Sequence, residues 1–419
     1  MKRGGVHFAS GVASSGEDEF NSTPRTIVRP GSHAPTFCAN TSYLPAIAPE
    51  GQKMASKALK KACDNERAFM VELYRATHGA GWRRNRHWMD ETRDLNNWEG
   101  ANFIDIGTKG ERGFMRSLSE LWLGGNQLGG SLPPVFAWQG CPNISVVEVH
   151  SNPDLGGPLP QLACLKRLVV LDCRKCKLEG ALPIDMPATL QRCLLAENKF
   201  DGPVPRWDCP KLRYLNLSHN RLTGLRERGV FADLGDLEML DCQDNLLRAE
   251  YAELFGRVLP YNLTALNLSR NRLAGSVGEA TCGARNLTNL ALSDNCLTGP
   301  LSEAFGTMTN LRDLRLGNNK LTGPVPRDLT RMSSLRTLSL RGNDLVGPLD
   351  AIRWGELKRC LVHLDLAGNP KLGGRLEAWN PKRAMQRRFS LAGEATGDDH
   401  DDEAEDAKAA GDAAGDGGG

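Results

Sequence analysis

The feature that most constrains this chain is a short apolar pattern that returns every 22 to 26 residues. One copy places Leu311, Leu314 and Leu316 ahead of Asn319, in the order L-x-x-L-x-L-x-x-N. A fixed period of this length predicts a solenoid of stacked turns rather than separate globular domains. The marker position, which is Asn in ten copies and Cys in one, falls at Asn126, Asn152, Cys176, Asn198, Asn220, Asn245, Asn271, Asn295, Asn319, Asn343 and Asn369.

Each copy predicts one short strand followed by a turn. In the stretch L-x-L the side chains alternate, so the two Leu residues face inward and the residue between them faces outward. We expect the outward residues to be exposed and the marker Asn to be buried. A buried amide without partners costs roughly 1–3 kcal/mol, so we predict that each marker Asn bonds to the neighbouring turn.

These residues resemble the leucine-rich repeat family. The elements that follow the marker, such as GGSLPP, GGPLP, EGALP, DGPVP and TGPVP, resemble its plant-specific type. The resemblance covers about residues 117–379 and implies an α/β solenoid of about eleven turns, with a parallel strand ladder on its concave face. Residues 225–262 lack the L-P element, and AEYAELFGRVL predicts a helix there.

A second block, residues 64–100, resembles the N-terminal cap of the same family. Asp64 is a candidate helix N-cap, and Trp82, Trp88 and Trp98 follow the helix. Without a cap, the Leu layer of the first turn would be exposed to solvent, so we expect these Trp residues to cover the core. At the other end, Trp379 and the basic segment PKRAMQRRF are expected to close it.

We therefore divide the chain into four parts. These are a flexible segment (1–53), a helical cap (54–117), the repeat solenoid with its C-terminal cap (118–390) and a disordered acidic tail (391–419). Residues 392–419 hold ten acids against one Lys, a charge of −9, which leaves +11 on the rest of a chain whose formal charge is +2. An acidic segment without large apolar residues is typical of disorder.

The twelve cysteines favour reduced thiols over disulfides. Cys173, Cys193 and Cys242 replace inward Leu residues and Cys176 replaces the marker Asn, so they are expected to be buried as small apolar groups. The pair Cys173–Cys176 spells C-x-x-C, but no second pair supports a zinc or redox site. The first residues lack a signal-like apolar core, and no apolar run is long enough to span a membrane. We therefore expect a cytoplasmic location, with a secreted or cell-surface location as the alternative if the true N-terminus is missing.

No catalytic, metal or phosphate-binding motif is present in the sequence, so no enzyme activity, cofactor or metal is predicted. Basic residues recur after the marker, at positions such as Lys199 and Arg221. The repeat consensus explains them, so no nucleic acid partner is expected. A protein partner and a monomeric state are predicted instead.

The candidate binding surface is the outward side of the strands. Apolar groups gather in the first six turns, where interface anchors are typical, although ordinary strand composition is an equally good explanation. The candidate partner-binding residues are Trp122, Val146, Glu148, His150, Val170, Asp172, Arg174, Arg192, Leu194, Tyr214, Asn216, Met239, Asp241, Arg315 and Asp365.

One motif lies beyond the repeats. Ser390 in Arg387-Arg388-Phe389-Ser390-Leu391 fits the preference of kinases that require basic residues. Phosphorylation there would place nearly two negative charges beside the Arg pair, so Ser390 is a candidate phosphosite.

Three classes of function can be compared with these features: an adaptor or recognition protein, an extracellular recognition or inhibitor protein, and an enzyme. We favour a non-enzymatic adaptor or recognition protein that binds a partner on the concave face. The alternative is an extracellular recognition or enzyme-inhibitor protein, since the repeats resemble those of plant receptor ectodomains and polygalacturonase-inhibiting proteins. An enzyme has no supporting residues.

Overall fold

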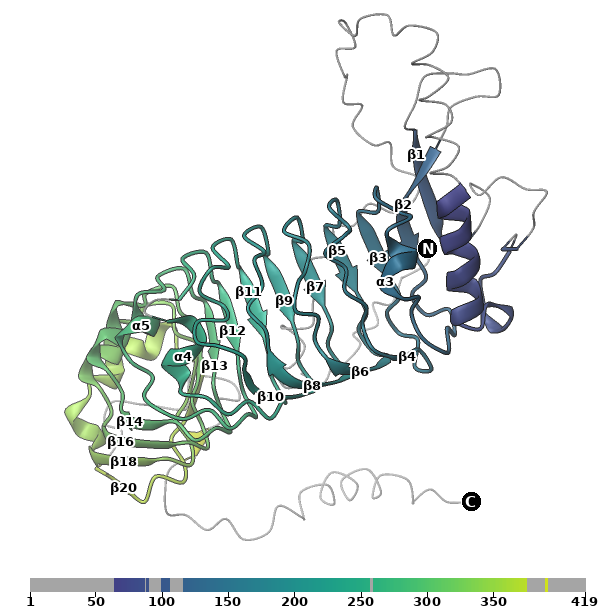
Figure 1. Cartoon of the computed structure of the whole chain (residues 1–419). Coiled ribbons are helices and arrows are strands. Elements are labelled where there is room, and N and C mark those ends of the chain that lie inside the picture. Colours follow the sequence, from purple (N-terminus) through teal and green to yellow (C-terminus); the bar gives the residue numbers. More distant parts are fainter. Residues whose placement is uncertain are drawn as a thin grey trace, which may run out of the picture.

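The computed structural model describes residues 64–86, 88–89, 99–105, 116–256, 259–374 and 389–390. Turns stack side by side along one axis, with a helix over residues 64–76 at one end (Figure 1). The predicted solenoid is confirmed. The expected flexible segment, the acidic tail, Trp98 and Trp379 lie outside the described residues.

The strand of each turn joins a 13-stranded sheet. Apart from β1, which is antiparallel to β2, its strands pair in parallel and in register, so that Leu290 lies opposite Leu266 and Leu314. We call the outward side of this sheet the concave face. The strands are β1 (Ala101–Asp105), β2 (Arg116–Trp122), β3 (Val146–Glu148), β5 (Val170–Asp172), β7 (Arg192–Leu194), β9 (Tyr214–Asn216), β11 (Met239–Asp241), β12 (Ala265–Asn267), β13 (Asn289–Ala291), β15 (Asp313–Arg315), β17 (Thr337–Ser339), β19 (His363–Asp365) and β21 (Phe389–Ser390).

The L-P elements form two further parallel sheets, which lie along the lower edge in Figure 1. One contains β4 (Gly156–Gly157), β6 (Lys177–Ala181), β8 (Lys199–Val204) and β10 (Arg221–Leu225). The other contains β14 (Thr298–Pro300), β16 (Lys320–Pro324), β18 (Asp344–Pro348) and β20 (Lys371–Gly373). The break between the two sheets falls where the sequence loses the L-P element.

Short helices occupy the remaining side of the turns. The predicted helix within residues 225–262 is confirmed as α4 (Tyr251–Phe255), which buries Tyr251, Leu254 and Phe255. The other helical elements are η1 (Gly79–Gly81), α3 (Val135–Trp138), α5 (Glu279–Cys282), η3 (Glu303–Thr307), η4 (Arg327–Arg331), η5 (Leu349–Ala351) and η6 (Trp354–Arg359).

The cap covers the first turn as predicted. Phe69, Leu73, Trp82 and Trp88 are buried, and the two indoles meet edge to face with their ring centroids 4.7 Å apart. No motif in the sequence indicates the role of Glu66. This carboxylate is buried, accepts hydrogen bonds from Ser117 Oγ and the Leu118 backbone N–H, and so ties the cap helix to β2.

The marker Asn residues form the predicted ladder. Asn295 Nδ2 donates to the Leu268 carbonyl of the preceding turn at 3.0 Å, and its Oδ1 accepts from the Leu273 backbone N–H at 3.0 Å. Asn220, Asn245, Asn271, Asn319 and Asn343 repeat this pair of bonds at similar distances. Each amide therefore satisfies backbone groups that the bend leaves unpaired.

Cys176 is tolerated in this ladder because of the turn before it. Its Sγ lies 3.4 Å from the Val149 carbonyl and takes the place of the amide donor, but a thiol offers no comparable acceptor. The preceding turn, NPDLGG, has one extra residue, and its Leu155 N–H bonds within the turn to the Asn152 carbonyl at 3.0 Å. The turn NPKLGG closes in the same way, from Leu372 N–H to the Asn369 carbonyl.

This difference predicts unequal costs of removing the marker. Asn295→Ala should lower the free energy of unfolding by roughly 2–4 kcal/mol, because it leaves buried backbone groups without partners. Cys176→Ala should cost about 1 kcal/mol, because only a weak donor and a small apolar volume are lost. Urea titrations followed by circular dichroism would measure both. Equal losses would contradict the proposed role of the ladder.

The alternation along the strands gives a second test. Leu314 is fully buried and Arg315 is half-buried on the opposite side of the sheet. Leu314→Ala should therefore cost roughly 2–5 kcal/mol by opening a core cavity, whereas Arg315→Ala should change stability by less than about 0.5 kcal/mol. Thermal unfolding of the two variants side by side would show whether the inward and outward assignments are right.

Candidate functional site

The concave face carries three columns of outward side chains, which run across the strands. We name them by position. The leading column starts each strand (Val146, Val170, Arg192, Tyr214, Met239), the middle column comes two residues later, and the trailing column two residues later again. The in-register pairing places members of a column opposite one another, as with Tyr214 between Arg192 and Met239.

The leading column is only partly exposed. Val146, Val170, Tyr214 and Met239 are all half-buried, and they form an apolar stripe on neighbouring strands. Arg192 interrupts the stripe and lies over the Tyr214 ring, with its guanidinium carbon 5.4 Å from the ring centroid. Its Nε is buried and has no hydrogen-bond partner among the residues that the structure describes.

The middle column corrects the prediction that the residues between the inward Leu positions are exposed. The exposed fractions are 9% for Glu148, 3% for Asp172, 5% for Leu194, 3% for Asn216 and 3% for Asp241. Each of these side chains has neighbours on both adjacent strands and on both sides along its own strand, so little of it reaches solvent. Trp122, Arg315 and Asp365, towards the two ends of the ladder, remain half-buried.

The polar side chains of the middle column accept hydrogen bonds from residues of the trailing column. Asp172 accepts two hydrogen bonds from the Arg174 guanidinium, at 3.0 and 2.8 Å, and one from its backbone N–H. Asn216 Oδ1 accepts from the Ser218 backbone and hydroxyl, and Asp241 accepts from the Gln243 backbone. Burial raises the pKa of Asp241 to about 6.

Glu148 differs from these residues. Among the described residues, no hydrogen bond to its carboxylate is found, and the imidazole Nε2 of His150 lies 3.9 Å from it. Burial, followed by the negative charge of Asp172, raises the pKa of Glu148 to about 7. Arg192 and Arg174 act in the opposite direction.

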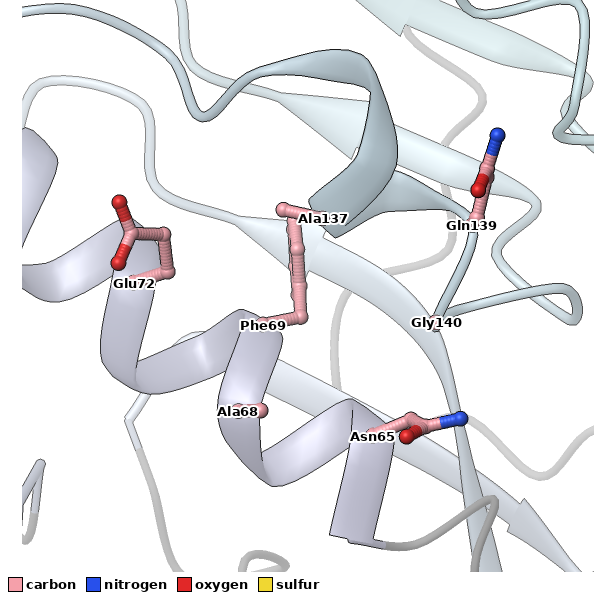
Figure 2. Close-up of a pocket in the computed structure, with 7 residues that line it drawn as sticks. All are labelled: Asn65, Ala68, Phe69, Glu72, Ala137, Gln139 and Gly140. Carbon is pink, nitrogen blue, oxygen red and sulfur yellow. The ribbon is translucent and has the colours of Figure 1, made fainter.

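One pocket lies away from this face, in the seam between the cap helix and α3 (Figure 2). Figure 2 shows Glu72 at one end of the seam and Asn65 and Gln139 at the other, so their polar atoms do not converge on one point. The pocket is lined by Asn65, Ala68, Phe69, Glu72, Ala137, Gln139 and Gly140. It marks where the cap meets the first turn and does not look like a catalytic site.

Two other predictions concern metal binding and the candidate phosphosite Ser390. No cluster of metal-binding side chains is found among the described residues. Ser390 lies in β21, whose backbone pairs with Leu364 and Asp365 at the end of the sheet. Its role as a phosphosite remains a prediction.

With the geometry in place, comparisons identify the family. Models described as leucine-rich repeats match residues 117–138, 208–225 and 285–345. The chain belongs to the leucine-rich repeat family. Its repeats are of the plant type, as the L-P elements indicated.

Known proteins with similar repeats include receptors. Receptor-like protein 32 of Arabidopsis thaliana is 32% identical over 101 residues, which is 23% of this chain and 12% of that protein. The Arabidopsis receptor kinase HAESA, solved with the peptide hormone IDA and the co-receptor SERK1, is 26% identical, with a TM-score of 0.49 over 64% of this chain and 48% of that chain. A TDR receptor is 24% identical, with a TM-score of 0.48 over 61% of this chain and 52% of that chain. This leucine-rich repeat chain thus spans about half the length of these solved chains and far less of the curated relative.

The predicted cytoplasmic location is wrong, because the curated relative that this leucine-rich repeat chain matches is a receptor-like protein. The cysteines do not indicate the compartment, for a physical reason. Cys173, Cys176, Cys193 and Cys242 are free thiols, and all four are buried in the repeat core. Burial raises the pKa of Cys176 to about 11 and raises those of Cys173, Cys193 and Cys242 further. Such protonated, enclosed thiols are unreactive and carry little information about the redox compartment. Among the described helices, none is long and apolar enough to cross a membrane.

The raised pKa of Glu148 predicts a specific dependence of stability on pH. Its folded pKa of about 7 exceeds the ordinary value of 4.5, so the folded state binds more protons between these pH values and loses stability as pH rises through the window. Glu148→Gln should therefore stabilise the protein by roughly 1–3 kcal/mol at pH 8 and by almost nothing at pH 4. Urea midpoints of the wild type and the variant across this range would measure it, and a pH-independent difference would contradict the assignment.

Proposed function

We propose that this chain is a non-enzymatic recognition module for signalling, which binds a protein or peptide partner on the first six repeat turns of its concave face, from β2 to β11. The observation that carries the proposal is the half-buried apolar stripe of Val146, Val170, Tyr214 and Met239. These four side chains, two on each side of Arg192, form an apolar contact surface on a rigid ladder of strands at no further folding cost. Aromatic and Met side chains of this kind are common anchors in interfaces.

The buried middle column changes the expected roles of the candidate residues. Leu194, Asn216 and Asp241 would shape the floor of the surface rather than contact the partner broadly. Val146, Val170, Tyr214 and Met239 would contact the partner directly, with Trp122, His150, Arg174 and Arg192 at the sides. Arg315 and Asp365 lie on later strands and would take part only with a long partner.

The receptor relatives favour an extracellular setting for this recognition. HAESA is solved with a peptide hormone and a co-receptor, and a short peptide is a partner that suits a narrow strand face. We therefore propose a peptide or a protein segment in extended conformation as the ligand class.

The test uses the full chain as bait for a displayed library of random 12-residue peptides. The double variant Trp122→Ala with Tyr214→Ala should weaken binding of the selected peptides by about tenfold or more, because it removes two half-buried anchors. Thr337→Ala with Ser339→Ala changes the equivalent columns on β17 and should leave the dissociation constant within about twofold. Isothermal titration with synthetic peptides would measure both, after circular dichroism has shown that each variant is folded. Unchanged affinity in the first variant would refute the proposal.

A further inference from the structure

We propose that the concave face recognises a basic side chain, Lys or Arg, of an extended peptide, by placing it against Glu148 between Trp122 and His150, with aliphatic neighbours of the peptide on Val146 and Val170. This inference rests on the proposed function and specifies the ligand that the face would take.

The first reason is that the polar groups next to Glu148 already have hydrogen-bond partners other than Glu148. On β2, Trp122 Nε1 donates to Glu120 Oε2 at 3.0 Å, and Asn102 donates to the same oxygen at 2.8 Å. On β5, the Asp172 carboxylate accepts two hydrogen bonds from the Arg174 guanidinium. Glu148 is thus a carboxylate that is nine-tenths buried and accepts no hydrogen bond from the described residues.

The second reason is the chemistry of the groups around it. The register places Trp122 directly opposite Glu148 on one side and Asp172 on the other. The Trp122 N–H is used by Glu120, so the half-buried indole is free to offer its face to a cation. Glu120 adds a further negative charge, so the carboxylates of Glu120, Glu148 and Asp172 face the two guanidinium groups of Arg174 and Arg192, and negative charge is in excess at this end of the face.

The third reason is that His150 is held where it cannot satisfy Glu148. The distance from its Nε2 to the carboxylate, 3.9 Å, is too long for a hydrogen bond. Its Nδ1 lies 3.1 Å from Ser151 Oγ, and its ring packs on Gly124, where an added Cβ would lie 2.5 Å from Nε2. The imidazole therefore forms a wall of the site, and the carboxylate is left for a group from outside.

The apolar neighbours define the rest of the ligand. Val146 precedes Glu148 by two residues on β3, and Val170 lies opposite Val146 on β5. A peptide in extended conformation alternates its side chains, so a basic residue over Glu148 can be followed by aliphatic residues along the leading column. A lone inorganic cation could not use these apolar contacts.

The site also predicts how affinity changes with pH. Only the ionised form of Glu148 attracts the cation, and its pKa in the free protein is raised to about 7 by burial and Asp172. The titratable and charged groups that face it are Glu120 on β2, His150 in the turn after β3, Asp172 on β5, Arg174 in the turn after β5 and Arg192 on β7. Affinity for a basic peptide should therefore rise by roughly tenfold from pH 6 to pH 8 as the ionised fraction grows.

The experiment selects 12-residue peptides on the full chain and then synthesises each Arg-containing peptide with citrulline in place of Arg. Citrulline keeps the shape and removes the charge. Against the wild type, the citrulline peptide should bind about tenfold more weakly, whereas against Glu148→Gln the two peptides should bind alike. Asp313→Asn, which removes a carboxylate on β15 of the same face, should behave as the wild type.

The outcomes separate this inference from the proposed function. Peptides that lose affinity for the Trp122→Ala/Tyr214→Ala variant but show no enrichment of Lys or Arg, or no coupling to Glu148, would overturn the inference and leave the proposed function standing. Peptides that bind both variants as well as the wild type, or a library that yields no binder, would count against both.

Discussion

The buried amide ladder is the interaction on which the rest of this structure depends. Each turn bends back sharply after its strand, and the bend leaves backbone groups that neither the strand ladder nor water can satisfy. The amide of Asn220, for example, donates to one turn and accepts from it at the same time. This reciprocal bonding fixes the rise from turn to turn, so the Leu layers stack in register.

The fixed rise also explains the concave face. Strands held in register place equivalent side chains directly opposite one another, and the middle column becomes a row of close neighbours. Polar groups in that row must find partners locally, as Asp172 does with Arg174. Among the described residues no hydrogen bond to the Glu148 carboxylate is found, and burial, followed by the negative charge of Asp172, raises its pKa. The same geometry that packs the core thus places a largely buried carboxylate beside an apolar stripe.

The cysteines illustrate how a repeat can mislead an argument from composition. A chain with twelve cysteines invites a decision between disulfides and reduced thiols. In the repeat, however, Cys193 and Cys242 stand in for Leu and are fully buried. Their chemistry reflects packing and carries little information about the compartment.

The sequence by itself determined the period, the inward Leu rows, the ladder, the cap with Trp82 and Trp88 and the helix α4, because each follows from local patterns that repeat. It did not reveal Glu66, the pairing of β1 or the left-handed backbone at residues such as Lys175 and His219, which precede the marker without being Gly. Only the tertiary structure decided which outward residues reach solvent. That property depends on neighbours one turn away, and alternation along a single strand contains no information about how closely the next strand approaches.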